Sequence, residues 1–151
     1  EQDIREISHD LNREKHALIS NFLAILNNLL EEQRSSFVPE VIVSIDDSIK
    51  WDELENTAKI NLYRIIQECL QNINKYASAK TIQLSIKKRG GDLNLTIADD
   101  GVGFSTNTKK KGIGLQNMVS RTQELNGTFD IRSKKSKGTT LEVTFPITVK
   151  V

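Results

Sequence analysis

The spacing of the apolar residues changes near residue 77, and this change constrains the fold more than any other feature of the sequence. From about residue 52 up to that point apolar residues recur every three or four positions, which predicts an amphipathic helix; the stripe is Leu62, Ile65, Ile66, Cys69, Leu70 and Ile73. Beyond it they recur at every second position, as in Ile82, Leu84 and Ile86 and then in Leu93, Leu95 and Ile97. Gly90 and Gly91 separate these two runs, which is typical of a β-hairpin.

The same patterns predict the order of the elements. We expect a long or broken helix that ends near Gln33, then a strand over Glu40–Ile45, a helix over 52–76, the hairpin over 82–97, a helix over 115–125 and a final hairpin over 129–145. Every predicted strand alternates apolar with polar residues, so one face of the sheet should be solvated and the other covered by helices. The expected fold class is α+β, a two-layer α/β sandwich of a mixed, mostly antiparallel sheet packed on helices.

Length and composition limit the function classes. A chain of 151 residues with 37% hydrophobic and 27% charged residues is typical of one globular domain. Its formal net charge of +1 provides no basic field for nucleic acid, and its apolar runs are too short to span a membrane. The one cysteine, Cys69, rules out a disulfide framework and favours a reducing, cytoplasmic compartment. Because a helical pattern is already under way at Glu1, we expect a piece of a longer protein.

Several common catalytic motifs are absent from the sequence. It has no G-x-x-x-x-G-K-[ST] phosphate-binding loop, and GIGLQN lacks the third glycine of a dinucleotide fingerprint. The two histidines, His9 and His16, lie on the first predicted helix without a cluster of ligands at metal-binding spacing. The chemistry must therefore be sought in other residues.

Polar residues on the helix predicted over 52–76 form the first candidate site. Glu68, Asn72 and Lys75 are spaced i, i+4, i+7, so they share one face, with Tyr76 at its edge. Oxygen ligands from an amide and a carboxylate suit Mg²⁺, and a lysine one turn further suits phosphates. Taken alone, however, the pattern favours a solvated helix edge with a routine Glu–Lys pair.

Glycines and acidic residues form the second and third candidates. Asp99 closes an apolar strand, where an inward carboxylate needs a donor such as the exocyclic amine of a purine. Gly101 and Gly103 would let the backbone approach the ring, although an acidic hairpin turn explains these residues equally well. Gly112 and Gly114 open the next helix, whose free N–H groups suit phosphate, but a plain helix entry is the alternative.

Two further stretches are weaker signals. The hydroxyls of Thr139 and Thr140, after Gly138, could reach a bound base directly or through water, but a threonine-rich strand start is the more common meaning. The lysines at 109–111 could screen a triphosphate, but three lysines in a polar loop are usually only solvated.

The order of these motifs is more specific than any one of them. ECLQNINKY (68–76), DDGVG (99–103), GIGL (112–115) and GTT (138–140) follow one another along the chain. In this order they resemble the ATP-binding domain of sensor histidine kinases, in the superfamily that includes gyrase, Hsp90 and MutL, and most of all the subfamily of nitrate and desaturase sensors. The resemblance covers residues 36–147. It implies a Bergerat-type ATP-binding fold, with ATP between the helices and a short lid over residues 104–111.

The resemblance also implies a role for each matching residue on the helix. Asn72 would coordinate Mg²⁺, and Glu68 would be the catalytic residue that polarises the attacking group or a water. Lys75 and Tyr76 would flank the phosphates and the nucleotide.

On the strand side, the resemblance implies that Asp99 accepts a hydrogen bond from the adenine amine. Gly101 and Gly103 would shape the adenine pocket, and Thr140 would support the contact between Asp99 and adenine. The lid hinges would be the glycines of the GIGL motif, which would also present N–H groups to phosphate; the motif consists of Gly112, Ile113, Gly114 and Leu115.

The N-terminal residues pose a separate question. REISHDL (5–11) superficially matches a phosphoacceptor motif, but only one helix fits between His9 and the strand at Val41, whereas a dimerising hairpin needs two. We therefore expect residues 1–35 to be an N-terminal helical segment with the end of the second hairpin helix and the linker into the first helix of the domain, and residues 36–151 to form the ATP-binding domain. His9 would then be a surface residue with the true acceptor upstream; the alternative is that His9 is the acceptor.

The implied function is that of the ATP·Mg²⁺-binding catalytic domain of a protein histidine kinase in a two-component phosphorelay. Its implied partners are a histidine-bearing dimerisation domain of the same longer protein and a response regulator. We expect the isolated chain to be monomeric and the longer protein to be a cytoplasmic homodimer, either free or anchored to a membrane. The alternatives are a serine kinase of the anti-sigma type on the same fold and a nucleotide-binding docking module without kinase activity.

Overall fold

The computed structural model describes residue 13 and residues 16–37, 40–103 and 113–147. The long elements are α2 (Phe22–Ser36), β1 (Glu40–Ile45), α3 (Asn56–Asn72), β2 (Thr81–Arg89), β3 (Asp92–Asp99), α4 (Ile113–Glu124), β4 (Thr128–Lys134) and β5 (Gly138–Pro146). Two short elements flank α3, a 3₁₀ turn over Trp51–Glu53 and a π-helical turn over Ile73–Ala77. No helix in these ranges is both long and apolar enough to cross a membrane.

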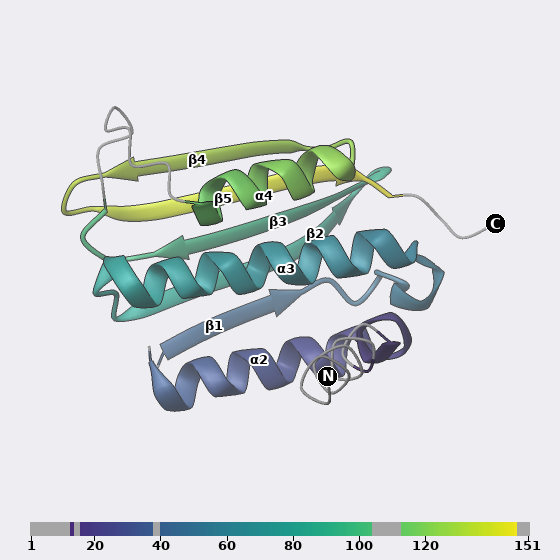
Figure 1. The fold of residues 1–151 in the computed structure, drawn as a ribbon, viewed down its shortest axis with the longest axis horizontal. Helices are drawn as coiled ribbons and strands as arrows, with labels where there is room; N and C mark the ends of the chain where they lie inside the picture. The colour runs from purple at the N-terminus through teal and green to yellow at the C-terminus, as the bar shows by residue number, and fades with distance from the viewer. Residues whose placement is uncertain (1–12, 14–15, 38–39, 104–112, 148–151) are drawn as a thin grey trace, which may run out of the picture.

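The strands form one five-stranded sheet in the order β1-β2-β3-β5-β4. β1 is parallel to β2, and the other three pairs are antiparallel. β2 and β3 form the predicted hairpin, and its turn contains Gly90 in the left-handed conformation at φ +61°. The predicted mixed, mostly antiparallel sheet packed on helices is therefore confirmed (Figure 1).

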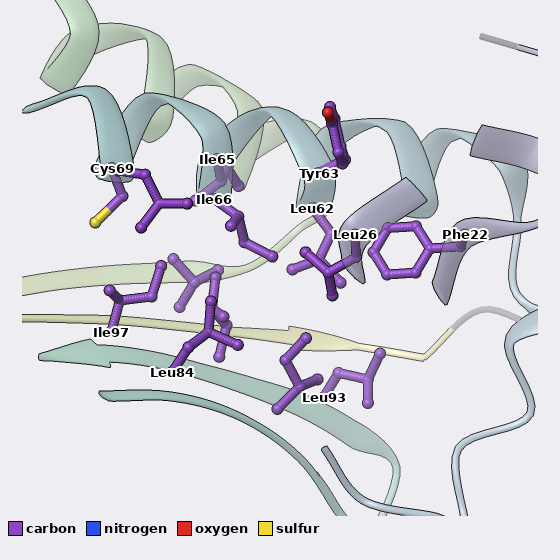
Figure 2. Close-up of a cluster of buried hydrophobic side chains, with 14 of the residues drawn as sticks. Phe22, Leu26, Leu62, Tyr63, Ile65, Ile66, Cys69, Leu84, Leu93 and Ile97 are labelled. Carbon is purple, nitrogen blue, oxygen red and sulfur yellow. The ribbon is translucent and has the colours of Figure 1, made fainter. Parts of the chain in front are cut away.

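The core lies between the sheet and the helices. Each strand places its alternating apolar side chains on one face, where they meet the stripe of α3 (Figure 2). The most deeply buried of these residues are Leu62, Ile65, Ile66, Ile82, Leu84, Ile86, Leu93, Leu95, Ile97 and Val143. Each such side chain contributes about 1.5–3 kcal/mol when it leaves water, so this interface is the main source of stability. The opposite face carries polar residues such as Gln83, Thr96 and Glu142, as the alternation predicts.

The N-terminal helix is broken rather than continuous. Residues 16–20 are helical, Asn21 leaves helical geometry at φ −152° and ψ 64°, and α2 then continues to Ser36. Four apolar side chains of this region lie in the same core as α3 and the sheet, namely Leu18, Phe22, Leu26 and Leu30. The predicted division between residues 35 and 36 falls within the last turn of α2, and it stays a prediction.

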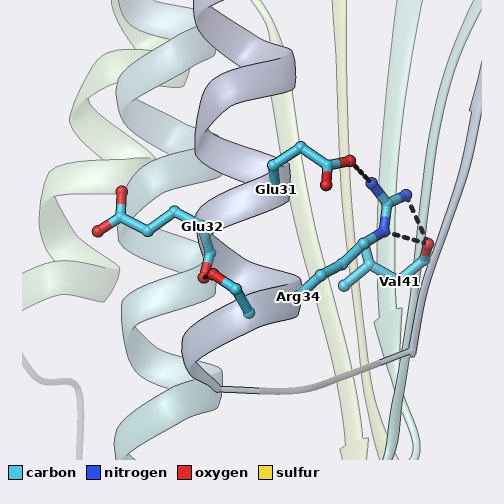
Figure 3. Close-up of polar contacts among 5 residues, drawn as sticks. Glu31, Glu32, Arg34 and Val41 are labelled. Atoms are coloured by element: carbon cyan, nitrogen blue, oxygen red, sulfur yellow. Dashed lines mark hydrogen bonds and ion pairs between the residues drawn. The ribbon is translucent and has the colours of Figure 1, made fainter.

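The last turn of α2 is attached to the edge strand β1. The guanidinium of Arg34 donates to the carbonyl of Val41 through Nε at 3.3 Å and Nη2 at 2.8 Å (Figure 3). Its Nη1 donates to the carboxylate of Glu31 on the preceding turn. These bonds satisfy an edge-strand carbonyl and fix the end of α2 against the sheet.

Candidate functional site

The candidate residues gather at one end of the sheet, where β3 ends and β5 begins (Figure 1). Asp99 is the last residue of β3, and its partner in the antiparallel register is Thr139. The π turn that follows α3 reaches the same place, because the amide of Val102 donates to the carbonyl of Ala77 at 2.7 Å. The folded chain thus brings the end of the 68–76 motif next to the 99–103 motif.

The two adjacent aspartates have different environments. Asp99 is half-buried, and burial raises the pKa of its carboxyl above the usual range; N–H groups of Gly101, at 2.8 Å, and Thr139 partly offset this. Asp100 is exposed, and the backbone N–H groups of Thr81 and Lys80, at 2.9 and 2.8 Å, lower the pKa of its carboxyl. Asp100 therefore joins this loop to the start of β2, and Asp99 is the carboxylate available for recognition.

Cys69 shows how close α3 comes to this carboxylate. Its side chain is buried, and the pKa of its thiol is raised to about 12, first by burial and then by the negative charge of Asp99. The thiol therefore stays protonated at neutral pH and is no nucleophile. Sequence reasoning placed Cys69 only in the apolar stripe of the helix and did not connect it with Asp99.

The glycines of the loop allow one backbone to approach another. A Cβ atom on Gly101 would overlap the carbonyl and the Cβ atom of Ala77. Gly103 has a φ of +65°, and a Cβ atom there would overlap the carbonyl of Lys134. The N–H of Ser136, in the turn between β4 and β5, also donates to the carbonyl of Val102 at 2.5 Å. The described close approaches are thus between segments of this chain, and the predicted contact of Gly101 and Gly103 with adenine stays a prediction.

The helix predicted over 52–76 is not one regular helix. A 3₁₀ turn precedes α3, because Trp51 turns inward and stacks on Phe22 with ring centroids 4.6 Å apart. At the other end α3 stops at Asn72 and continues as a π turn, after which Ser78 is left-handed at φ 50°. The regular spacing assumed for the predicted polar face therefore holds only as far as Asn72.

The four predicted residues of this helix fall on both sides of that change. Glu68 and Asn72 are half-buried on α3, whereas Lys75 and Tyr76 are exposed on the π turn. Tyr76 is 73% exposed, which makes it the most exposed large hydrophobic residue in the described ranges. The wider turn thus presents Lys75 and Tyr76 to solvent beside the loop that follows Asp99.

The strand register corrects the expectation for Thr140. Thr140 is opposite Ala98, so its side chain is on the solvated face of the sheet, away from Asp99. Thr139 is opposite Asp99 on the helix-covered face, and its hydroxyl is 2.7 Å from that of Ser133. Thr139, rather than Thr140, is therefore placed to support a contact made by Asp99. Counting back by twos from the inward Leu141 would have identified it.

The last predicted motif is only partly described. Gly112 lies outside the described residues, as do the lysines at 109–111 and His9. Gly114 lies in the first turn of α4, and Leu115 is half-buried against the core. Leu115 therefore has at least a packing role.

The donors and acceptors at this end of the sheet fit a purine nucleotide. Two backbone N–H groups use part of the acceptor capacity of Asp99, and the remaining lone pairs can accept from an exocyclic amine. The oxygens of Asn72 and Glu68 are ligands that Mg²⁺ prefers, and Lys75 supplies a point charge for phosphate. Within the described ranges no three or more His, Cys, Asp or Glu residues cluster as metal ligands. A cation here would thus depend on oxygens from a bound phosphate as well.

Comparisons with known proteins agree on the type of domain. Residues 57–149 match the family model described as histidine kinase-, DNA gyrase B- and HSP90-like ATPase. Sensor histidine kinase YdfH of Bacillus subtilis (strain 168) is 46% identical over 91 residues, which is 58% of this chain and 22% of that protein. The histidine-protein kinase/phosphatase DegS of Brevibacillus brevis is 35% identical over 102 residues, covering 67% of this chain and 26% of DegS. The chain thus spans about a quarter of the length of these relatives.

A solved structure supports the fold. The histidine kinase domain from the Erythrobacter litoralis EL346 blue-light activated histidine kinase superposes with a TM-score of 0.69 at 17% identity. The match covers 85% of this chain and 61% of that one.

Proposed function

This chain belongs to the family of histidine kinase-, DNA gyrase B- and HSP90-like ATPases, and from this premise we propose that it is the ATP·Mg²⁺-binding catalytic domain of a sensor histidine kinase. In this role it holds ATP so that a histidine on a separate helical domain can attack the γ-phosphate. A response regulator is the next acceptor in the relay, and the longer protein acts as a cytoplasmic homodimer. The names of the relatives YdfH and DegS support the kinase assignment.

The half-buried carboxylate of Asp99 is the observation that carries this proposal. Burial makes the ionised form of Asp99 costly in the free protein, and its pKa is raised because the neighbouring N–H groups compensate only in part. A ligand that donates a hydrogen bond to Asp99 would remove this cost. The exocyclic amine of adenine is such a donor, and Thr139 on the same face can support the contact directly or through water.

The end of α3 and the π turn serve the phosphates in this proposal. Asn72 contributes an oxygen ligand to Mg²⁺, and Glu68 accepts a proton from, or polarises, the attacking group. Lys75 and Tyr76 flank the phosphates and the nucleotide. Bound Mg²⁺ neutralises phosphate charge, so the chain contributes mainly by positioning and by electrostatics.

We assign the remaining motif residues to the rim of the site. Gly101 keeps the loop close to the π turn and Gly103 keeps it close to the end of β4, and together they define one wall of the adenine pocket. Gly112 and Gly114 act as hinges of the lid and present N–H groups to phosphate. Leu115 holds the start of α4 to the core while the lid moves.

Calorimetric titration with Mg·ATP tests the assignment of Asp99. Asp99→Asn should weaken binding by about a hundredfold. An amide has one acceptor oxygen where the carboxylate has two, so a buried hydrogen bond to a charged group is lost. Asp92→Asn, at the exposed first position of the same strand, is the matched control and should bind as the wild type does. Equal affinities of the two variants would refute the adenine assignment.

A second assay tests the reaction. With Mg·ATP, this chain should phosphorylate the histidine of the separate histidine-bearing domain. The phosphohistidine is labile in acid, and its phosphoryl group should pass to a response regulator. Acid-stable phosphoserine on a partner would instead indicate a serine kinase. Nucleotide binding with no transfer to any partner would indicate a docking module.

A further inference from the structure

A reciprocal pair of side-chain amides joins α2 to the π turn. Nε2 of Gln33 donates to Oδ1 of Asn74 at 2.7 Å, and Nδ2 of Asn74 donates to Oε1 of Gln33 at 3.0 Å. Gln33 is only 4% exposed, in the last turn of α2, and Asn74 is 41 residues away in the sequence. Two mutually satisfied amides, of which Gln33 is buried and Asn74 half-buried, fix both distance and orientation between their elements.

Asn74 is the second residue of the π turn that carries the predicted phosphate-side residues Lys75 and Tyr76. Asn72 immediately precedes the π turn, and Lys75 and Tyr76 are part of it. A π turn is rare and is maintained where its surroundings stabilise it. Here the turn is held from both sides, by Gln33 through Asn74 and by the amide of Val102 through the carbonyl of Ala77.

We propose that Gln33 and Asn74 are positioning residues for the nucleotide site. Their amide pair fixes the π turn so that Lys75 and Tyr76 are presented to the nucleotide. Because Ala77 in the same turn bonds to the loop after Asp99, the pair also stabilises that loop. This inference rests on the proposed function, and it adds two residues that touch neither nucleotide nor metal.

Variants of the pair separate positioning from stability. Gln33→Leu leaves the half-buried amide of Asn74 without this partner, and Asn74→Leu does the same to the buried amide of Gln33. Both variants should raise the Kd for Mg·ATP about tenfold, as expected for the loss of hydrogen bonds shielded from solvent. Each single variant should also lower the melting temperature, because one amide loses its partner. The double variant Gln33→Leu/Asn74→Leu removes both amides, so its melting temperature should return toward that of the wild type while its Kd for Mg·ATP stays raised. The exchanged pair Gln33→Asn/Asn74→Gln keeps a reciprocal amide contact and should restore most of the affinity.

Arg34→Met is the matched control. Arg34 is next to Gln33 and also holds the last turn of α2, but its bonds lead to Val41 and Glu31 rather than to the π turn. Its Kd should stay within about twofold of the wild type if the effect travels through Asn74. An equal loss of affinity in Arg34→Met would show that any loosening of α2 suffices, and wild-type affinity in Gln33→Leu would also overturn the inference.

Hydrogen exchange at the Val102 amide tests the coupling without nucleotide. Gln33→Leu should accelerate this exchange and Arg34→Met should not, because only the former releases the turn that holds Ala77. If the wild type failed to bind Mg·ATP, the proposed function would fail, and the coupling would be judged on this measurement alone. Unchanged exchange at Val102 in Gln33→Leu would refute it.

Discussion

At the scale of single residues, neighbouring side chains of the same type perform opposite tasks. Burial raises the pKa of Asp99, whereas two backbone N–H donors lower the pKa of Asp100. The difference follows from position: Asp99 is the last residue of β3 and lies on the helix-covered face, whereas Asp100 follows the strand and meets the N–H groups of Lys80 and Thr81. Asp100 thus stabilises the fold, whereas ionised Asp99 costs stability in the free protein.

The pH dependence of stability should show this difference. For Asp99 the folded pKa is raised, so its contribution is full below its usual value, near 4, and is lost as pH rises through the folded pKa. For Asp100 the folded pKa is lowered, so its contribution is present above that value and is lost as pH falls through the folded pKa.

Thermal unfolding of Asp99→Asn and Asp100→Asn between pH 3 and pH 8 would check this (a range of roughly five units around the carboxyl values). Without nucleotide, Asp99→Asn should melt above the wild type at neutral pH, and the gain should disappear in acid. Asp100→Asn should melt below the wild type at neutral pH, and its deficit should shrink in acid. Lower stability of Asp99→Asn at neutral pH would contradict the assigned cost of the buried carboxylate.

Thr139 and Thr140 show which part of the site the sequence could have predicted at this scale. The inward side chains of Leu141 and Val143 fix the alternation of β5, and this alternation selects Thr139 as the partner of Asp99. The prediction of Thr140 does not follow this alternation. Burial is the larger cause of the raised pKa of Cys69 and follows from the apolar stripe of the helix, whereas the further rise due to the charge of Asp99 comes from a residue on another element, so no local pattern could have predicted that part.

At the scale of elements, patterns predicted what the local chain determines and failed where distant contacts decide. β1 agrees with the predicted strand, because the alternating residues of Glu40–Ile45 can place their apolar side chains toward the core in only one register. The π turn over Ile73–Ala77 follows a helical pattern in the sequence, and its wider geometry depends on Gln33 and on Val102. Residues this far away in the chain contribute nothing to a periodicity count.

The contact between the π turn and the loop after Asp99 predicts the effect of a single methyl group. Gly101→Ala would place a Cβ atom against the backbone carbonyl of Ala77, which cannot move without breaking its bond to Val102. We expect a loss of about 1–3 kcal/mol in the free energy of unfolding, together with weaker nucleotide binding. Denaturant unfolding and titration with Mg·ATP measure the two effects.

Gly91→Ala is the control for this substitution. Gly91 lies in the hairpin turn with nothing within 4 Å of an added Cβ atom, so the free energy of unfolding should change by less than about 0.5 kcal/mol. Equal losses in the two variants would show that glycine flexibility, rather than close packing, governs Gly101.

At the scale of the whole molecule, the folding unit is larger than the region that defines the family. The family match begins at residue 57, after α2 and β1. Yet Leu26 and Leu30 of α2 are buried in the same core as α3 and the sheet, and Phe22 stacks on Trp51. The first helices thus provide one side of the core and also place Gln33 against Asn74 of the π turn.

A shortened chain tests this claim. A chain that begins at residue 38 loses four buried side chains, Leu18, Phe22, Leu26 and Leu30, and with them about 6–12 kcal/mol of apolar burial. This is as large as the whole stability of a typical domain, so the shortened chain should show no cooperative thermal transition and should not bind Mg·ATP. A chain that begins at residue 13 keeps all four side chains and should unfold cooperatively. If the chain from residue 38 also melted cooperatively and bound Mg·ATP, then α2 would be an accessory to the domain, and its coupling to the π turn could not be needed to form the site.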